Sequence, residues 1–343
     1  MARHINLPVF IPHEGCPNDC VFCNQRTISG TRRFDITSVP AQIKERLTTL
    51  PDSDTFVELA YFGGSFTGLE RCDMRFLLDI ARRHLDAGKI HAVRVSTRPD
   101  YIDGDIIAEL KKGGVSTVEL GVQSMCDRVL TASGRGHAAS DTIRAFGLLK
   151  AAGFSVVGQM MIGLPASTGA DEVETARRIC EMGADAARVY PLAVLRGTAL
   201  ERMTARGEYS PLSADAMIRR TADVLEVFAD FGVKVIRVGL CASEELADGV
   251  AVGNYPPALG EMAMSEVYLR RIKAALNDAA VNAFDLRRGQ ARVLRIMVPR
   301  GAISKAAGHH GVNKSALCNK SGFKDVKFIE NADLPEYTVK ITR

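Results

Sequence analysis

Three cysteines near the N-terminus carry the strongest chemical signal in the chain. Cys16, Cys20 and Cys23 form a C-x3-C-x2-C pattern in a segment rich in turn-forming Gly, Pro, Asn and Asp. Such short spacers let three thiolates converge on one inorganic centre, and three ligands for a 4Fe-4S cluster leave one iron open to a small molecule. Two alternatives stay open: a zinc site completed by His13, and a redox pair of Cys20 and Cys23.

The cysteines follow the first of several short apolar runs, which alternate with amphipathic stretches. The runs predict buried strands at residues 7–11, 55–62, 92–97, 115–122, 155–162 and 186–190. The stretches predict helices at residues 39–50, 70–87, 105–112, 141–152, 171–182 and 214–231. Strand-helix units in this order predict an α/β fold with parallel strands, and six units are too few for eight-fold closure. We therefore expect a partial (β/α)6 TIM-type barrel, with its site at the C-terminal ends of the strands.

The C-terminal part has a different element order and charge. A loop or linker is expected at residues 239–260 and a helix at 261–277. A β-α-α-β-β pattern follows, at residues 291–298, 303–307, 312–319, 326–329 and 337–341. Residues 286–343 hold twelve Lys and Arg against four Asp and Glu, whereas the whole chain has a net charge of +4. The expected domains are the barrel at 1–285 and a small basic α+β domain at 286–343, which suits a polyanion or a solvated surface.

The overall composition narrows the class of protein. Hydrophobic residues make up 46% of the chain, and 44 Lys and Arg nearly balance 40 Asp and Glu, which excludes a disordered or fibrous protein. We find no long uncharged apolar run and no signal-peptide core, so we expect a cytoplasmic protein without a membrane partner. The other five cysteines are scattered and do not suggest a disulfide framework.

The cysteine pattern, with Phe22 before its last cysteine, resembles the hallmark of the radical S-adenosylmethionine (SAM) superfamily. Further motifs extend the resemblance over about residues 7–272 and are most similar to the radical domain of the Elongator catalytic subunit. They are FGGSF at 62–66, TRPDY at 97–101, VELGVQS at 118–124, GRGH at 134–137, MMIGLP at 160–165 and VYPLAVLRGT at 189–198. Several are shared with oxygen-independent coproporphyrinogen oxidases. The resemblance implies a 4Fe-4S cluster whose open iron chelates SAM, and an electron from a donor such as flavodoxin or ferredoxin that cleaves SAM to a 5′-deoxyadenosyl radical.

The resemblance also implies which residues hold SAM. Backbone carbonyls of Gly63, Gly64 and Ser65 would face its amino group, and Arg135 would pair with its carboxylate. The nucleoside or methionine part would be bound by Gln123 and Gln159.

Three further residues are implied as catalytic in the barrel mouth. Glu119 and Arg98 would bind SAM, substrate or each other, and Tyr190 is a weaker candidate. Ser96 stands where related proteins carry an acidic residue for the ribose hydroxyls, so this contact is expected to be weakened. The acetyltransferase domain of the Elongator subunit does not follow in this sequence, so we do not expect to carry over an acetyl-CoA-dependent reaction.

The basic tail is similar to a KH-type element, in which a GxxG loop between two helices binds RNA phosphates. The residues implied in RNA binding are Arg300, Lys305, Gly308, His309, His310, Gly311 and Lys314. The alternative is a small packing domain that covers the open edge of the barrel.

These features favour a radical SAM enzyme that modifies RNA, with tRNA as the expected substrate. A second hypothesis keeps the chemistry but makes the substrate a small molecule such as a tetrapyrrole. A third is a non-catalytic iron-sulfur RNA-binding regulator, which the implied SAM contacts argue against.

Overall fold

The computed structural model describes residues 3–16, 20–25, 34–50, 55–240, 248–253, 255–278, 293–321 and 323–342. They form two compact units, one of Met1–Pro211 with Val233–Gly253 and the other of Leu212–Gly232 with Asn254–Arg343. The predicted domain boundary between residues 285 and 286 lies outside the described residues.

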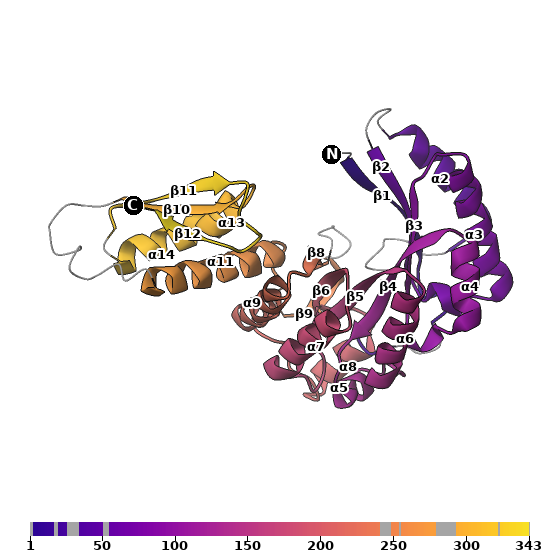
Figure 1. Cartoon of the computed structure of the whole chain (residues 1–343). Helices are drawn as coiled ribbons and strands as arrows, with labels where there is room; N and C mark the ends of the chain where they lie inside the picture. Colours follow the sequence, from indigo (N-terminus) through magenta and orange to yellow (C-terminus); the bar gives the residue numbers. More distant parts are fainter. Residues whose placement is uncertain are drawn as a thin grey trace. The chain divides into compact units, whose positions relative to one another are not determined.

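The first unit is built on a parallel sheet of seven described strands, in the order β1-β2-β3-β4-β5-β6-β8. The strands are β1 (Arg3–Ile11), β2 (Thr55–Gly63), β3 (Ala92–Thr97), β4 (Val115–Gln123), β5 (Ser155–Ile162), β6 (Ala186–Pro191) and β8 (Lys234–Val238). The sheet curls, and β1 and β8 form its two edges (Figure 1). The predicted partial α/β barrel is confirmed.

The sheet has one strand more than the six predicted. Strand β8 is only five residues long and none of its residues is fully buried, so it lacks the apolar run by which the other strands were predicted. The short helices α5 (Asp127–Ala132) and α8 (Ala199–Ala205), and the antiparallel pair β7 (Val194–Leu195) and β9 (Val250–Val252), also went unpredicted.

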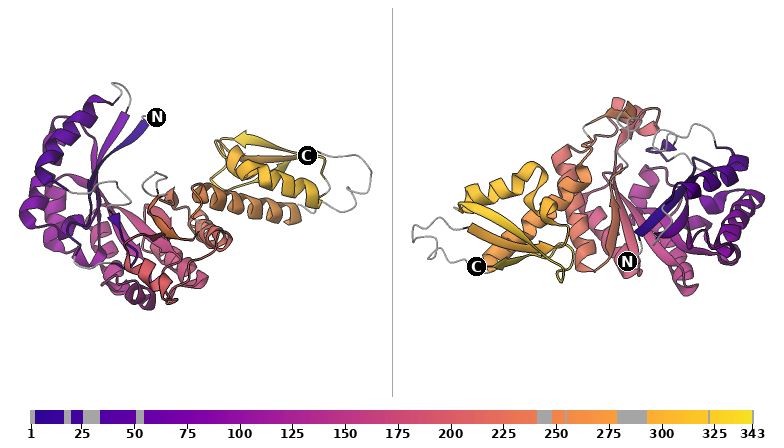
Figure 2. Two further views of the ribbon diagram at one scale, coloured as in Figure 1. Left: turned by 180° about the vertical axis from the view of Figure 1, so that it is seen from behind. Right: turned by 90° about the horizontal axis from the view of Figure 1, so that it is seen from above.

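The longer helices of this unit lie on the outer, convex side of the sheet (Figures 1 and 2). They are α2 (Val39–Thr48), α3 (Arg71–Asp86), α4 (Gly104–Lys112), α6 (Ala139–Ala151) and α7 (Gly169–Glu181). Two of these helices begin at a capping side chain. Asp103 accepts a hydrogen bond from Ile106 N–H at the N-terminus of α4, and Thr168 accepts one from Asp171 N–H at the N-terminus of α7.

Strand side chains alternate between the two faces of the sheet. Leu59, Val93 and Leu120 are fully buried, as expected beneath the helices. Their neighbours Glu58, Arg94 and Glu119 alternate with them and interact with one another from strand to strand. The concave face of the sheet is therefore polar along its centre.

In the second unit, the long helices α9 (Ala214–Asp230) and α11 (Leu259–Asp278) pack on each other. Its sheet has the order β11-β10-β12, with β10 (Val293–Pro299) parallel to β11 (Asp325–Asn331) and antiparallel to β12 (Lys340–Thr342). Between β10 and β11 lie α13 (Ile303–Ala307) and α14 (Val312–Ser321). The predicted β-α-α-β-β order is confirmed. No helix in the described part of the chain has the length and apolar character needed to cross a membrane.

Candidate active site

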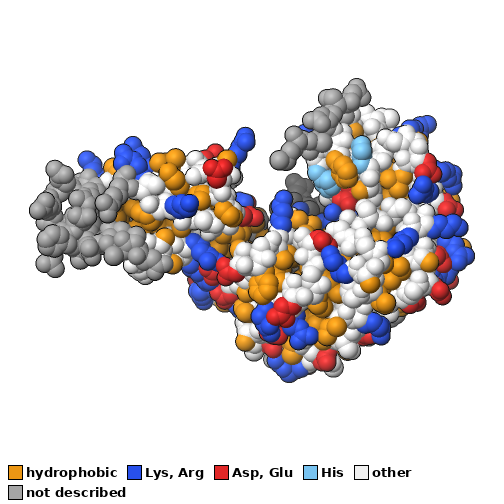
Figure 3. All heavy atoms as spheres, viewed as in Figure 1, with side chains coloured by type: hydrophobic (Ala, Val, Ile, Leu, Met, Phe, Trp, Pro, Cys, Tyr) orange, Lys and Arg blue, Asp and Glu red, His pale blue; other side chains and the backbone are white. Residues whose placement is uncertain are grey.

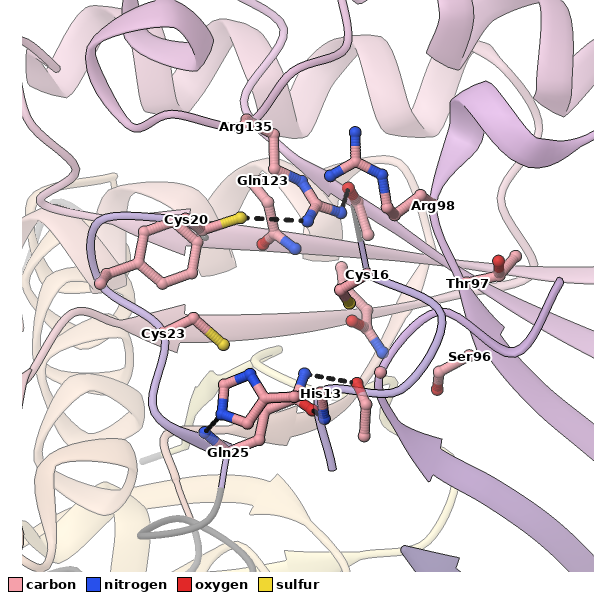
Figure 4. A pocket seen from close by; sticks show the side chains of 15 residues that line it. His13, Cys16, Cys20, Cys23, Gln25, Ser96, Thr97, Arg98, Gln123 and Arg135 are labelled. Carbon is pink, nitrogen blue, oxygen red and sulfur yellow. Dashed lines mark hydrogen bonds between the residues drawn. The ribbon is translucent and has the colours of Figure 1, made fainter. Parts of the chain in front are cut away.

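The cysteine loop follows β1 at the C-terminal edge of the sheet. Cys16, Cys20 and Cys23 are free thiols that line one cavity of about 150 Å³ (Figure 4). The loop is tied to its surroundings through the backbone, since Val21 N–H donates to Ser133 O over 3.1 Å. In the described part of the chain, His, Cys, Asp and Glu side chains form no group arranged to hold a single metal ion. A 4Fe-4S cluster instead distributes its cysteine ligands over separate irons.

Burial is the largest influence on the pKa values of two of the thiols, Cys16 and Cys23. It raises the pKa of Cys16, and burial together with the neighbouring Cys20 and Cys16 raises the pKa of Cys23 to about 12. Arg135 opposes the increase for both thiols. These thiols are therefore protonated at neutral pH in the absence of iron, and binding iron would release their protons.

The paired glycines after β2 let the cysteine loop approach the strand end closely. A Cβ at Gly63 would lie 2.7 Å from Ile11 O, and one at Gly64 would lie 1.9 Å from Glu14 O. Gly64 N–H donates to Ile11 O over 2.7 Å, and Ser65 N–H donates to Glu14 O over 3.1 Å. The glycines are thus required for packing of this loop, and their predicted carbonyl contacts to SAM stay a prediction.

An irregularity at the end of β4 turns Gln123 into the cavity. The pairing of β4 with β5 shifts register between Gly121 and Gln123, and Gln123 has a φ of 62°. Gly121 makes room for Arg135, because a Cβ there would lie 2.6 Å from Arg135 Nη2. Arg135 donates from Nη2 to Gly121 O over 2.8 Å and from Nη1 to Cys20 Sγ over 3.5 Å.

Arg98 enters the same cavity from the end of β3. Its side chain is almost fully buried, and it donates from Nε and Nη2 to Asp100 over 3.0 and 2.8 Å. It does not pair with Glu119. Ser65 Oγ lies 2.9 Å from Thr97 Oγ1, which joins the ends of β2 and β3 beside Arg98.

Glu119 lies instead at the centre of a buried ionic network. It accepts from Arg94 Nη1 over 2.8 Å and from Arg188 Nε over 3.0 Å. Ser96 Oγ and Gln159 Nε2 also donate to it, over 3.4 and 2.6 Å. With its side chain inaccessible to solvent, Glu119 acts here as a fixed acceptor that orients its neighbours.

A second cavity of about 420 Å³ adjoins the first on the concave face. Both are lined by Phe22, Cys23, Gln25, Gly63, Ser96, Gln123 and Gln159. Tyr190 lines only the second cavity, where its hydroxyl lies 3.4 Å from Arg188 Nη1 and burial raises the pKa of its phenol.

The family model described as Radical SAM superfamily matches residues 10–179, and the Radical_SAM C-terminal domain model matches residues 184–271. The chain belongs to the radical SAM superfamily. Its cofactors are therefore a 4Fe-4S cluster and SAM, and it is an enzyme.

Three relatives of this radical SAM enzyme span different shares of its length. It is 30% identical to the uncharacterized protein MJ0486 of Methanocaldococcus jannaschii, over 62% of this chain and 68% of that protein. It is 37% identical to the tRNA uridine(34) acetyltransferase of the same organism, over 37% of this chain and 24% of that protein. It is 31% identical to Elongator complex protein 3 of Danio rerio, over 65% of this chain and 44% of that protein. The chain thus spans less than half of the last two relatives.

A solved structure supports the same fold. The archaeal Methanocaldococcus infernus Elp3 with a deleted N-terminus (1–46) superposes with a TM-score of 0.58 at 22% identity. The match covers 82% of this chain and 64% of that one. It shows a common radical SAM fold.

The cavity residues fit the radical SAM cofactors. Three thiols border the cavity, and two nearly buried guanidinium nitrogens, Arg98 Nη1 and Arg135 Nε, have no partner among the described residues. Buried donors require an acceptor, and a carboxylate is the group that guanidinium nitrogens bind best. The arginines are therefore suited to the carboxylate of SAM, with the thiols as ligands of the cluster.

The residues implied in RNA binding lie on the second unit. Arg300, His309 and His310 are exposed, and the two imidazole rings are 4.1 Å apart between centroids. Gly308 and Gly311 both have positive φ and form the turn between α13 and α14. Lys314 pairs with Asp325 over 2.9 Å, so its charge is already partly compensated.

Three cavity residues were missed in the sequence, and a fourth, His13, was considered only as a zinc ligand. Thr97 and Gly121 lie inside motifs that were recognised, but their roles depend on contacts with neighbouring strands. Gln25 lies two residues after the last cysteine, and this position beside the cysteine pattern is the signal that would have singled it out.

Proposed function

We propose that this radical SAM enzyme cleaves SAM reductively and modifies RNA, with tRNA as its substrate. The proposal rests on one observation: the cavity lined by the thiols opens into a larger cavity through shared residues. A substrate group in the larger cavity would lie beside a cofactor in the smaller one. When bound, the cluster and SAM supply a carbon-centred radical, while the chain orients the substrate and excludes water.

The walls of the larger cavity suit a flat, unsaturated ring with polar edges. Phe10 and Phe62 have ring centroids 6.2 Å apart, and the Arg188 guanidinium lies 5.4 Å from the Phe62 centroid. Aromatic faces stack on nucleobases, and Arg donates to their carbonyl groups. This chemistry supports an RNA base as the group that enters.

The C-terminal residues support RNA as the carrier of that base. The GHHG turn precedes α14 on a segment, residues 286–343, that holds a surplus of eight positive charges. Figure 3 shows Lys and Arg side chains dispersed over the visible face of this part of the chain rather than in one patch. We therefore expect contacts to a few phosphates around the turn. The relative named tRNA uridine(34) acetyltransferase favours tRNA over other RNA.

Two measurements test the reaction. Reconstituted protein, given a low-potential reductant and SAM under anaerobic conditions, is expected to form 5′-deoxyadenosine. Mass spectrometry of nucleosides from cells with and without the protein is expected to reveal a modified base that disappears with it. If SAM is not cleaved, the non-catalytic regulator is favoured instead.

A binding experiment tests the role of the tail. The double variant Arg300→Ala and Lys305→Ala should weaken tRNA binding and lower the salt slope by about one for each lost phosphate contact. Lys314→Ala should have a smaller effect because Asp325 already pairs with it. Lys111→Ala with Lys112→Ala, on α4 of the first unit, is the matched control. Unchanged affinity in the first variant would favour a small-molecule substrate such as a tetrapyrrole.

A further inference from the structure

Gln25, two residues after the last cysteine, ties the cysteine loop together through its backbone N–H and both ends of its side-chain amide. Its backbone N–H donates to His13 Nε2 over 2.9 Å, and its Oε1 accepts from the His13 backbone N–H over 2.5 Å. Its Nε2 donates to Gly63 O over 2.7 Å. The orientation of the amide is self-consistent, because an N–H can only be met by the oxygen and a carbonyl only by the NH2 group. Figure 4 shows the two side chains together on one side of the cavity.

These bonds close a ring of chain around the cysteines. His13 lies three residues before Cys16, and Gln25 lies two residues after Cys23, so the reciprocal pair brackets all three ligands. Bringing the two ends of such a loop together lowers the conformational entropy of the chain, and the hydrogen bonds between His13 and Gln25 offset this loss. His13 also has a φ of 62°, a conformation that a non-glycine residue adopts only when its surroundings hold it there.

The third bond of Gln25 fixes this ring to the sheet. Gly63 ends β2, and its neighbour Gly64 donates to Ile11 O at the end of β1. The loop is therefore anchored to the carboxyl ends of two adjacent strands. The positions of the thiols follow from the sheet rather than from the loop alone.

The same contacts define the chemistry of His13. Its Nε2 accepts the Gln25 N–H, so this nitrogen carries a lone pair that is already engaged. Through Nε2, His13 is a structural acceptor and not a fourth metal ligand. This arrangement is compatible with a cluster that keeps one iron free of protein ligands.

We propose that His13 and Gln25 are positioning residues forming a clasp, meaning their reciprocal pair of hydrogen bonds, that holds the three thiols in place and slows loss of the cluster. The clasp acts on the cofactor site and does not depend on the nature of the substrate.

Loss of the cluster to a chelator tests the clasp. Reconstituted full-length protein is mixed with excess EDTA under anaerobic conditions, and the decay of its visible absorbance is followed. Gln25→Ala and His13→Ala should each shorten the half-time about tenfold, as expected for losing one or two net hydrogen bonds. His13→Ala removes the bond from the Gln25 backbone N–H, whereas Gln25→Ala removes the bonds to the His13 N–H and to Gly63 O, so the double variant should decay at least as fast as the faster single variant. Gln42→Ala is the matched control, since Gln42 bonds only locally to Ser38, and it should keep the wild-type half-time.

Gln25→Glu is a second, milder probe. It keeps an oxygen for the His13 N–H but has no donor for Gly63 O, so an intermediate half-time is expected. Wild-type half-times in the Gln25→Ala and His13→Ala variants would overturn the proposal. The assay contains neither RNA nor SAM, so its result is independent of the proposed function.

Discussion

Gln159 Nε2 donates a hydrogen bond of 2.6 Å to Glu119 Oε2 across the adjacent strands β5 and β4. Glu119 also accepts hydrogen bonds from Arg94 and Arg188, and as an acceptor it holds the NH2 end of Gln159. The amide oxygen of Gln159 is thus the end available to a ligand in the cavities it lines. Glu119 therefore orients Gln159, and its predicted catalytic role stays a prediction.

The first prediction concerns the charge of Glu119. Glu119→Gln should destabilise the protein by about 3 kcal/mol, because it breaks a buried ion pair and leaves Arg188 without a carboxylate. Urea unfolding measures the loss. Glu174→Gln, which breaks an exposed pair with Arg177 on α7, should leave the midpoint nearly unchanged. Equal effects of the two substitutions would contradict the role of the network.

The second prediction concerns the space that Gly121 leaves for Arg135. A methyl group in Gly121→Ala would displace the Arg135 guanidinium, so SAM binding should weaken by at least tenfold, as measured by equilibrium dialysis. Gly147→Ala is the control, since no atom lies within 4 Å of the added methyl group. That substitution should stabilise α6 by about 0.5–1 kcal/mol and leave SAM binding intact. Wild-type affinity in Gly121→Ala would sink the prediction.

The third prediction is a pH dependence that arises from His137. Burial, and then the charge of Arg135, lowers the pKa of His137 from 6.5 to about 4. Between these values the unfolded chain binds a proton that the folded chain does not, so stability falls as the pH drops from 6.5 towards 4. The total loss is about 3 kcal/mol. His137→Gln should flatten this dependence when urea unfolding of the apo-protein is measured at about pH 7.5, 6 and 5. An unchanged slope would show that other groups are responsible.

The fourth prediction concerns the cluster ligands. Cys20→Ala should abolish the visible absorbance of reconstituted protein and the formation of 5′-deoxyadenosine, because two thiolates cannot hold the centre. Iron and sulfide analysis provides an independent readout. Cys72→Ala removes an exposed thiol on α3 and should retain both properties. Full turnover by Cys20→Ala would contradict the assignment of the cluster site.

Several features of this protein were set by local sequence. The three cysteines lie within one short segment, so their common role as ligands of one inorganic centre could be predicted from the sequence alone. The apolar runs predicted β1 to β6, since a strand buried on both faces must be apolar along its length. The C-terminal element order followed from the same periodicities. Strand β8 was not predicted, because its five partly exposed residues do not form a continuous apolar run.

Other features were decided only by tertiary structure. Arg98 pairs with Asp100 rather than Glu119, and Gln123 faces the cavity because β4 shifts register against β5. Gln25 contacts His13 only because the tertiary structure places these two residues, twelve positions apart, side by side. Short spacings constrain residues within one segment, whereas contacts between strand ends depend on register and on the curl of the whole sheet. The sequence by itself therefore determined which chemistry the chain can support, and the fold decided which side chains hold that chemistry in place.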